Sequence, residues 1–140
     1  MFETYDDLDG ANGTLKIGVS SASKPFVYIK DGKYAGFEVE LMIGFCREYG
    51  YRLEFEDTAF AAIISGVSSG RYDIGMSGIT ITEERRESVD FSAVNHTEDL
   101  VLVIHKQSDV KTFEDYKNAN VGITTGTYAA TIIHDIFPDA

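Results

Sequence analysis

The residues best suited to bind a small charged molecule lie between Ser77 and Arg86. Arg85 carries a planar guanidinium, which can donate two hydrogen bonds to a single carboxylate group. Thr80 offers a hydroxyl, and the Gly78 backbone can approach a ligand closely because no Cβ intervenes. This segment therefore predicts a carboxylate-binding site. The alternative is an ordinary turn between a strand and a helix, with a solvated arginine pair.

The neighbouring residues predict the elements that hold this segment in place. Residues 72–76 predict a short buried strand. Thr82 fits the N-cap of a following helix, because its side-chain oxygen can accept a hydrogen bond from the first turn. Glu83 and Glu84 would then lie in that first turn, where carboxylates offset the helix dipole.

Residues with catalytic or metal-binding chemistry are sparse. The three histidines, His96, His105 and His134, lie at spacings that match no metal-binding motif. The sequence contains no nucleophile elbow, no paired-cysteine motif and no phosphate loop. We therefore expect no catalytic residue, no metal site and no cofactor.

Two further positions could touch a ligand, and each has a structural alternative. Residues 124–127, with Thr127 next to a predicted helix, could bind an anion because free backbone N–H groups point outward at a helix start. The alternative there is an ordinary connection between a strand and a helix. Phe60 could form a flat platform for a ligand, although an isolated phenylalanine more often belongs to the core.

Length, composition and charge restrict the class of protein. The chain has 140 residues, 44% of them hydrophobic, which is enough for one domain with a real core. Its formal net charge of −11 argues against nucleic acid or an anionic membrane surface as a partner. No apolar run approaches the ~20 residues that span a bilayer. The single cysteine, Cys46, lies in an apolar pattern and is expected to be buried, and it does not decide the compartment.

The order of the predicted elements indicates a mostly parallel sheet covered by helices. Strands are expected at residues 15–20, 26–29, 52–56 and 73–77, with a hairpin-like turn at Asp31-Gly32. Helices are expected from residue 37 to a stop at Gly50, over residues 61–67 with Gly70 as the end signal, and from residue 83. Small ligands sit beyond the carboxyl ends of strands in such sheets. The loops that could meet at that edge are residues 20–23, 58–60 and 77–82.

Apolar patterns add two expectations about packing. Phe37, Leu41, Phe45 and Tyr49 recur at steps of four, so one face of the helix before Gly50 is apolar. Residues 100–104 form a continuous apolar run, which is consistent with a strand buried on both faces. Beyond them, a further strand is expected at residues 121–123 and a helix at residues 128–137.

Residues 36–41, Gly-Phe-Glu-Val-Glu-Leu, resemble the signature of the family 3 extracellular solute-binding proteins, which are the polar amino-acid receptors of ABC transporters. The resemblance runs from about Leu15 to the C-terminus. Further segments resemble the family and occur in the same order along the chain: Lys24-Pro25-Phe26, Phe60 before an apolar helix, residues 70–73, residues 78–85, residues 89–92 and residues 121–127.

This resemblance implies an α/β fold of the type II periplasmic-binding-protein class, in which two lobes close on a ligand. By this resemblance residues 15–93 would be a nearly complete first lobe, while the polar composition of residues 1–14 indicates a leader or linker without a core of its own. Residues 94–99 would form the hinge crossing, and residues 100–140 an incomplete second lobe. Family members normally run longer, so the resemblance implies a truncated chain.

The resemblance also implies roles for the site residues. Arg85 would pair with the α-carboxylate of the ligand, and Thr80 and the Gly78 backbone would bind its polar head. Phe60 would pack against the ligand, and Thr127 would reach the carboxylate from the second lobe.

Ser23 departs from the family pattern, because many members place an aromatic lid at this position. The packing of side chains on the ligand would then be one-sided, and the identity of the ligand stays open.

The implied function is extracytoplasmic binding of an amino acid or similar small polar solute for uptake by an ABC transporter, without catalysis. The partners would be that ligand and an ABC permease or a fused membrane component. The protein would be periplasmic or at the cell surface, associated with the membrane through its parent protein. The alternatives are the sensing domain of a receptor or sensor kinase, and a dehydratase-type enzyme on the same fold.

An incomplete second lobe would leave the edges and faces of residues 100–104 exposed. We therefore expect the chain to dimerise, to swap segments or to pair with a complementary piece. On its own it should bind ligand weakly or not at all.

Overall fold

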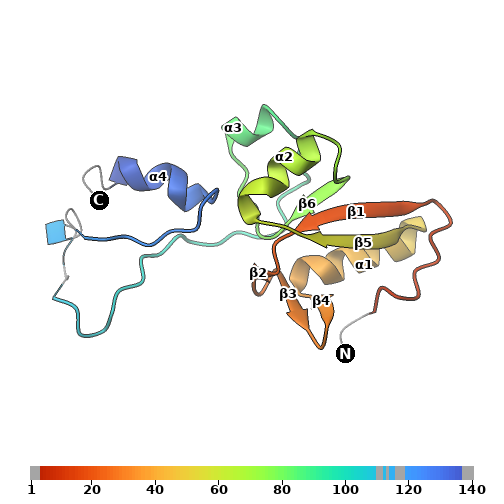
Figure 1. The fold of residues 1–140 in the computed structure, drawn as a ribbon, viewed down its shortest axis with the longest axis horizontal. Helices are drawn as coiled ribbons and strands as arrows, with labels where there is room; N and C mark the ends of the chain where they lie inside the picture. The colour runs from red at the N-terminus through yellow and green to blue at the C-terminus, as the bar shows by residue number, and fades with distance from the viewer. Residues whose placement is uncertain (1–3, 110–111, 113, 116–118, 137–140) are drawn as a thin grey trace. The chain divides into compact units, whose positions relative to one another are not determined.

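A computed structural model describes residues 4–109, 112, 114–115 and 119–136. The chain divides into two compact units, residues 1–90 and residues 91–140. The described strands, and all of the described helices except α4, belong to the first unit (Figure 1).

The main sheet of the first unit is parallel, as the alternation of strands and helices predicts. β1 (Thr14–Val19) lies between β5 (Arg52–Asp57) and β6 (Ile74–Met76). β1 pairs with both neighbours in parallel, and the last residues of the three strands are in register. All three strands therefore end at one edge of the sheet.

Each helix of the first unit begins close to a helix start that is expected from the sequence. The helices are α1 (Phe37–Tyr49), the 3-10 helix η1 (Phe60–Ala62), α2 (Ile63–Ser68) and α3 (Glu83–Arg86). Gly50 ends α1 with a φ of 68°, the left-handed conformation expected of a glycine stop.

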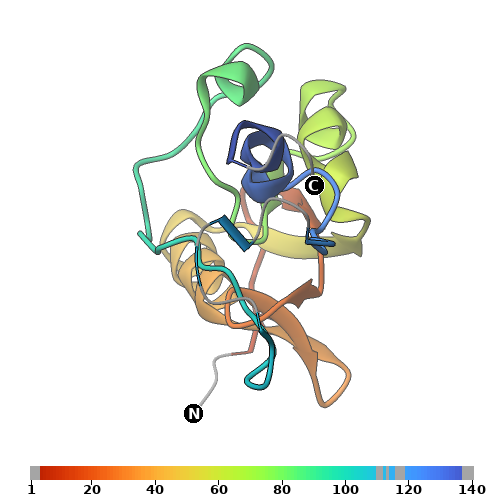
Figure 2. The same cartoon turned by 90° about the vertical axis from the view of Figure 1, so that its left-hand side faces the viewer.

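α1 and α2 cover opposite faces of the sheet (Figure 1 and Figure 2). Ile17 of β1 belongs to the same buried core cluster as Val39 of α1. Its neighbour Gly18 points to the other face, because successive strand residues alternate. There the ring of Tyr72 packs so closely on Gly18 and on Gly66 of α2 that no Cβ would fit at either glycine.

A small antiparallel sheet precedes α1. It consists of β2 (Ala22–Ser23), β3 (Val27–Lys30) and β4 (Lys33–Ala35), in that order. The turn between β3 and β4 has φ angles of 51° at Asp31 and 78° at Gly32. Two positive φ angles are what a two-residue hairpin of type I′ requires, so the predicted hairpin is confirmed.

The row of apolar residues at steps of four on α1 does not face the core. Phe37, Leu41, Phe45 and Tyr49 are each 42–51% exposed. Val39, Ile43 and Cys46 are buried instead, each at 1% exposure, together with Glu38. α1 therefore has two apolar rows, and the buried row is that of Val39, Ile43 and Cys46. Burial also raises the pKa of the Cys46 thiol, as expected of an inert core cysteine.

Residues 4–13, which the polar sequence indicates as a leader or linker without a core of its own, pack on the rest of the first unit. Leu8 is only 5% exposed. The Tyr5 hydroxyl accepts a hydrogen bond from the Tyr34 backbone N–H at 3.2 Å, and the Tyr5 ring meets the Phe55 ring edge-on with centroids 5.2 Å apart. The sequence does not predict this packing, because the segment is mostly polar and only Tyr5 and Leu8 contribute to it.

The second unit contains α4 (Tyr128–Ile136), which lies where a helix was predicted. The prediction of a buried strand at residues 100–104 is wrong for this structure. These residues form no strand and are 45–92% exposed. Residues 121–123 form no strand either. A strand requires a neighbour for its backbone N–H and C=O groups, and no described residue of this unit belongs to a strand.

Candidate ligand-binding site

Three loops leave the carboxyl edge of the parallel sheet, and hydrogen bonds tie them together. The Ser20 backbone N–H donates to Ser77 Oγ at 2.7 Å, and the Ser77 hydroxyl donates to the Ser20 carbonyl at 3.2 Å. The Ser21 N–H donates to Asp57 Oδ1 at 3.0 Å, and the Thr58 N–H donates to the Val19 carbonyl at 2.8 Å. The loops after β1, β5 and β6 therefore meet at one edge, as expected from the sequence.

Gly78 is held in the middle of this edge. Its φ is 67°, and a Cβ there would lie 2.9 Å from the Phe26 ring, so a side chain would be both strained and crowded. The Gly78 N–H donates to Glu38 Oε2 at 3.0 Å. This N–H is therefore already engaged by a carboxylate, and a ligand ammonium group, which is itself a donor, could be bound here only by the carbonyl oxygens of the segment.

Arg85 is oriented by the loop that precedes it. The Thr82 hydroxyl caps α3 by accepting the Arg85 backbone N–H at 3.2 Å, which confirms the predicted N-cap. Arg85 Nη1 donates to the Thr80 carbonyl at 2.5 Å. Partial burial lowers the pKa of Arg85, and the neighbouring Glu84 carboxylate opposes that shift. A guanidinium stays protonated at neutral pH regardless, so Arg85 is a fixed positive charge at this edge.

Ser23 and Phe60 lie in the short elements that follow β1 and β5. Ser23 belongs to β2, pairs with Val27 and is partly buried. Phe60 is the first residue of η1, shortly after β5, and its side chain is also partly buried. Ser23 and Phe60 thus lie shortly after the ends of β1 and β5, on segments that leave the same edge of the sheet as the loop after β6.

Thr127 lies in the second unit, at the start of α4. Its hydroxyl donates to the Thr124 carbonyl at 2.7 Å and accepts the Ala130 N–H at 3.4 Å. These two hydrogen bonds make Thr127 the N-cap of α4. A capping role agrees with the alternative that this segment is an ordinary connection leading into a helix. Its approach to a ligand carboxylate stays a prediction.

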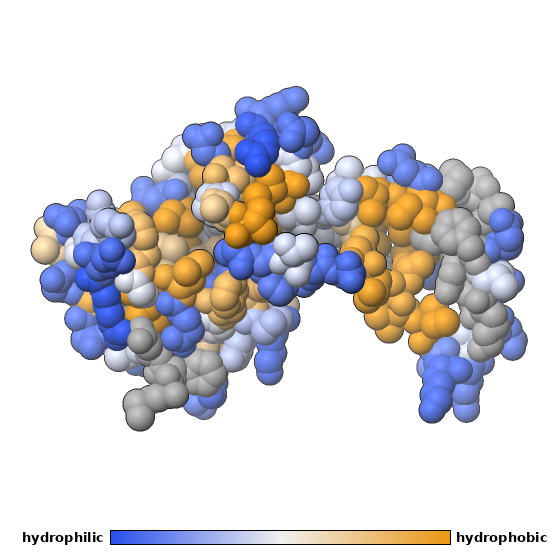
Figure 3. All heavy atoms as spheres, turned by 180° about the vertical axis from the view of Figure 1, so that it is seen from behind, coloured by the Kyte–Doolittle hydropathy of each residue, from blue (hydrophilic) through white to orange (hydrophobic). Residues whose placement is uncertain are grey.

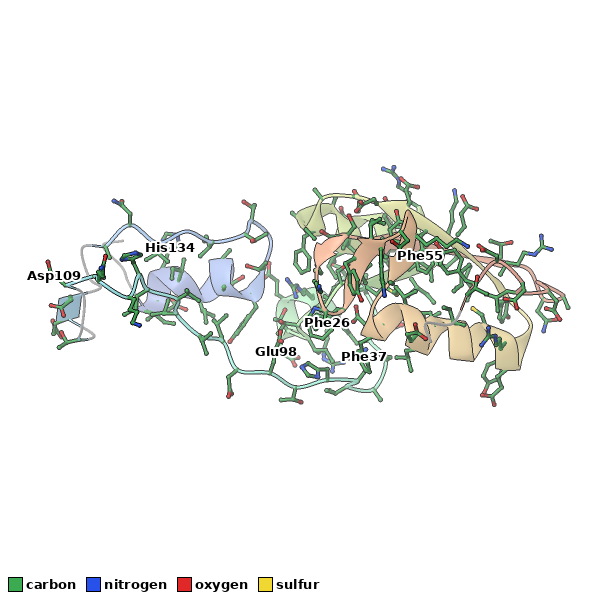
Figure 4. All side chains as sticks on the ribbon, turned by 90° about the horizontal axis from the view of Figure 1, so that it is seen from below. Phe26, Phe37, Phe55, Glu98, Asp109 and His134 are labelled. Carbon is green, nitrogen blue, oxygen red and sulfur yellow. The ribbon has the colours of Figure 1, made fainter. Side chains whose placement is uncertain are left out.

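Two residues that sequence reasoning left without a role help to shape the site. Glu38 and Phe26 both contact Gly78, although they lie far from it in the chain. Phe26 lies beside the start of α1, as Figure 4 shows, and its carbonyl accepts the Glu38 N–H at 3.2 Å. The sequence signal for both was that they lie in segments that resemble the family, residues 24–26 and 36–41. Such a resemblance does not predict which loop a side chain contacts.

Within the described parts of the chain, no group of three histidine, cysteine or acidic side chains is placed to hold a metal ion. No helix there is both long enough and apolar enough to cross a membrane.

Comparison with known proteins decides the family. The family model of bacterial extracellular solute-binding proteins, family 3, matches residues 15–130. The chain belongs to this family.

Curated relatives of this family 3 chain are named as binding proteins. It is 35% identical over 113 residues to the arginine-binding extracellular protein ArtP of Bacillus subtilis, covering 81% of this chain and 44% of ArtP. It is 32% identical over 133 residues to the ABC transporter arginine-binding protein 1 of Escherichia coli, covering 93% of this chain and 54% of that protein. The chain therefore spans about half the length of the curated relatives it matches.

Solved structures show the same fold. An ancestral amino acid-binding protein, described as a precursor of cyclohexadienyl dehydratase, superimposes with a TM-score of 0.83 at 34% identity, covering 99% of this chain and 63% of that one. An ancestral arginine-binding protein bound to arginine superimposes with a TM-score of 0.76 at 30% identity, covering 91% and 57%. This family 3 chain thus has part of the type II periplasmic-binding-protein fold, as the sequence predicts.

Proposed function

We propose that this chain supplies the carboxylate-binding side of an amino-acid receptor for ABC-transporter uptake. The observation that carries the proposal is the placement of Arg85. Arg85 lies in α3, and its guanidinium reaches back to the Thr80 carbonyl on the loop after β6, at the edge where parallel sheets bind small ligands. Family membership supports the same reading.

In this proposal Arg85 pairs with the α-carboxylate of the ligand, and the Thr80 hydroxyl and a backbone carbonyl at Gly78 bind its ammonium group. Phe60 packs against the ligand beside Ser23, which leaves room where many family members carry an aromatic lid. Thr127 completes the carboxylate contact from the second lobe when the lobes close.

L-Arginine is the first candidate ligand, because several relatives are named for arginine binding. The formal net charge of −11 also favours the approach of a cationic amino acid over an anionic one. The receptor would act outside the cytoplasm, associated with the membrane through the rest of its protein, and would deliver its ligand to an ABC permease.

The test is titration calorimetry with the twenty common L-amino acids, on a protein of the relatives' length that carries these residues. At least one should bind near micromolar affinity, about −8 kcal/mol. Arg85→Ala should weaken that binding by about 2–5 kcal/mol, because it removes one partner of a desolvated charge pair.

Arg86→Ala is the matched control for this test. Arg86 is exposed and pairs at 3.8 Å with Glu83 on its own helix. Its replacement should change the affinity by less than about 0.5 kcal/mol. Equal affinities for the wild type and the Arg85 variant would remove the role proposed for Arg85.

The same protein should not turn over its ligand. The dehydratase alternative deserves a direct assay, because one structural neighbour is an ancestral precursor of cyclohexadienyl dehydratase. Conversion of a cyclohexadienyl acid by the protein would favour that alternative over binding without catalysis.

A further inference from the structure

We propose that Glu38 is a positioning residue of this site, which fixes the peptide between Ser77 and Gly78 so that the Ser77 carbonyl is set for a ligand ammonium group. The proposal rests on the proposed function for its ligand, but the contact itself is independent of it. Glu38 Oε2 accepts the Gly78 N–H at 3.0 Å, across forty positions of sequence.

The burial of Glu38 shows that this carboxylate is an internal group of the fold. Glu38 is only 6% exposed, whereas glutamate is almost never fully buried unless its charge is paired or hydrogen-bonded. No buried side-chain oxygen or nitrogen of the described residues lacks a hydrogen-bond partner. Glu38 is also in the first turn of α1, where the helix dipole stabilises a negative charge.

One hydrogen bond can set a carbonyl direction because the peptide group is rigid. The Gly78 N–H and the Ser77 carbonyl belong to one planar trans peptide and point to opposite sides of it. Holding the N–H toward α1 therefore turns the Ser77 carbonyl away from α1. Glycine would otherwise let this peptide rotate, since it has the widest choice of backbone angles.

Two further contacts hold the same peptide. The Ser77 hydroxyl is bonded to the backbone of Ser20, and the Phe26 ring occupies the space that a Cβ at residue 78 would need. The Phe26 carbonyl in turn accepts the N–H of Glu38. Glu38, Phe26 and Gly78 are thus connected to one another. Removing the Glu38 carboxylate removes the hydrogen bond that joins the Glu38 side chain to the Gly78 N–H. A site whose polar groups are fixed before binding spends less of its binding free energy on ordering them.

The direct test is hydrogen exchange of the Gly78 amide, measured by NMR on the 140-residue chain. We expect exchange to speed up by about tenfold or more in Glu38→Ala, since the hydrogen bond to a charged group is lost. Glu38→Gln keeps an acceptor oxygen but loses the charge, so its exchange should rise by about threefold. Glu48→Ala and Glu48→Gln, on the exposed surface of the same helix, should leave the rate unchanged.

The second readout is ligand affinity in the protein used for calorimetry, at a temperature where every variant is folded. Glu38→Ala should raise Kd by about tenfold or more, with Glu38→Gln between it and the wild type. Ile43→Ala is the control for a purely structural effect, because this α1 residue is buried but faces the sheet core. It should lower the melting temperature while leaving Kd within about threefold.

The outcomes separate the two proposals. If the wild type binds no amino acid, the proposed function fails, while Gly78 exchange still decides whether Glu38 holds the loop. If the wild type binds and Glu38→Ala binds equally well, the positioning role is wrong and the function stands. If Glu38→Ala does not fold, Glu38→Gln decides, and a Gly78 exchange rate equal to that of Glu48→Gln overturns the proposal.

Discussion

At the scale of single residues, two glycines of the α1 region have opposite roles. Gly36, which precedes the helix, has a φ of 131°, a conformation essentially reserved for glycine. A Cβ there would lie 2.2 Å from the Phe26 carbonyl oxygen. Gly44, inside the helix, has no atom within 4 Å of the place where its Cβ would be. The family signature thus begins with a glycine that the backbone requires.

We predict that Gly36→Ala destabilises the chain and Gly44→Ala stabilises it. The first change should lower the free energy of unfolding by about 2 kcal/mol or more, through backbone strain and the clash with Phe26. The second should raise it by about 0.5–1 kcal/mol, because alanine favours a helix interior over glycine. Urea denaturation of the three proteins measures both effects. Equal stability of the two variants would contradict this account of α1.

Individual site residues were predictable to the extent that their roles are local. The cap by Thr82 and the position of Arg85 after a strand could be inferred from neighbouring residues. The bond between Glu38 and Gly78 could not, because it joins residues that only the folded chain brings together.

At the scale of elements, α1 has two apolar rows with unequal tasks. The inner row packs on the sheet, and the outer row is about half exposed. On the outer row, the rings of Phe45 and Tyr49 lie 4.7 Å apart, and Phe45 also stacks on Tyr51 at 6.3 Å. These rings shield one another in part, but they add no contact to the core.

The two rows should respond differently to truncation. Ile43→Ala should cost about 2–5 kcal/mol, because it opens a cavity in the core. Leu41→Ala should cost less than about 1 kcal/mol, since half of that side chain is already in water. Thermal or urea unfolding measures both, and a larger loss for Leu41→Ala would mean that the outer row is the buried one.

The boundaries of elements were predictable because they depend on local signals, such as Gly50 after α1 and the turn at Asp31-Gly32. The face that an element buries was less so, since the spacing of apolar residues on α1 permits either row. The strand expected at residues 100–104 required a pairing partner, and its own sequence cannot supply one.

At the scale of the whole molecule, the second unit exposes a run of apolar side chains. Val101 and Val103 are 70% and 92% exposed, and the surface of this unit shows broad hydrophobic areas (Figure 3). Exposed apolar runs of this kind favour association with another chain.

We predict that the 140-residue chain self-associates through these residues. At tens of micromolar, light scattering should give a mass above the 15.5 kDa of one chain. Changing Val101 and Val103 together to lysine should restore the monomer mass, because two charges would have to be desolvated in any contact. Leu41→Lys, on the exposed row of α1, is the matched control and should not. A wild-type mass of one chain would contradict the prediction.

The strand order also determines when the first unit can form during synthesis or refolding. Among the described residues, β1 is the first strand and also the central strand of the parallel sheet, and both of its neighbours come later. Thr14 pairs with Arg52, and Ile17 pairs with Ile74. Contacts between residues so distant in sequence are slow to form, whereas the β3–β4 hairpin and α1 depend on near neighbours. A growing chain must therefore keep its central strand unpaired until β5 emerges from the ribosome, and the edge that carries Arg85 becomes complete only after β6.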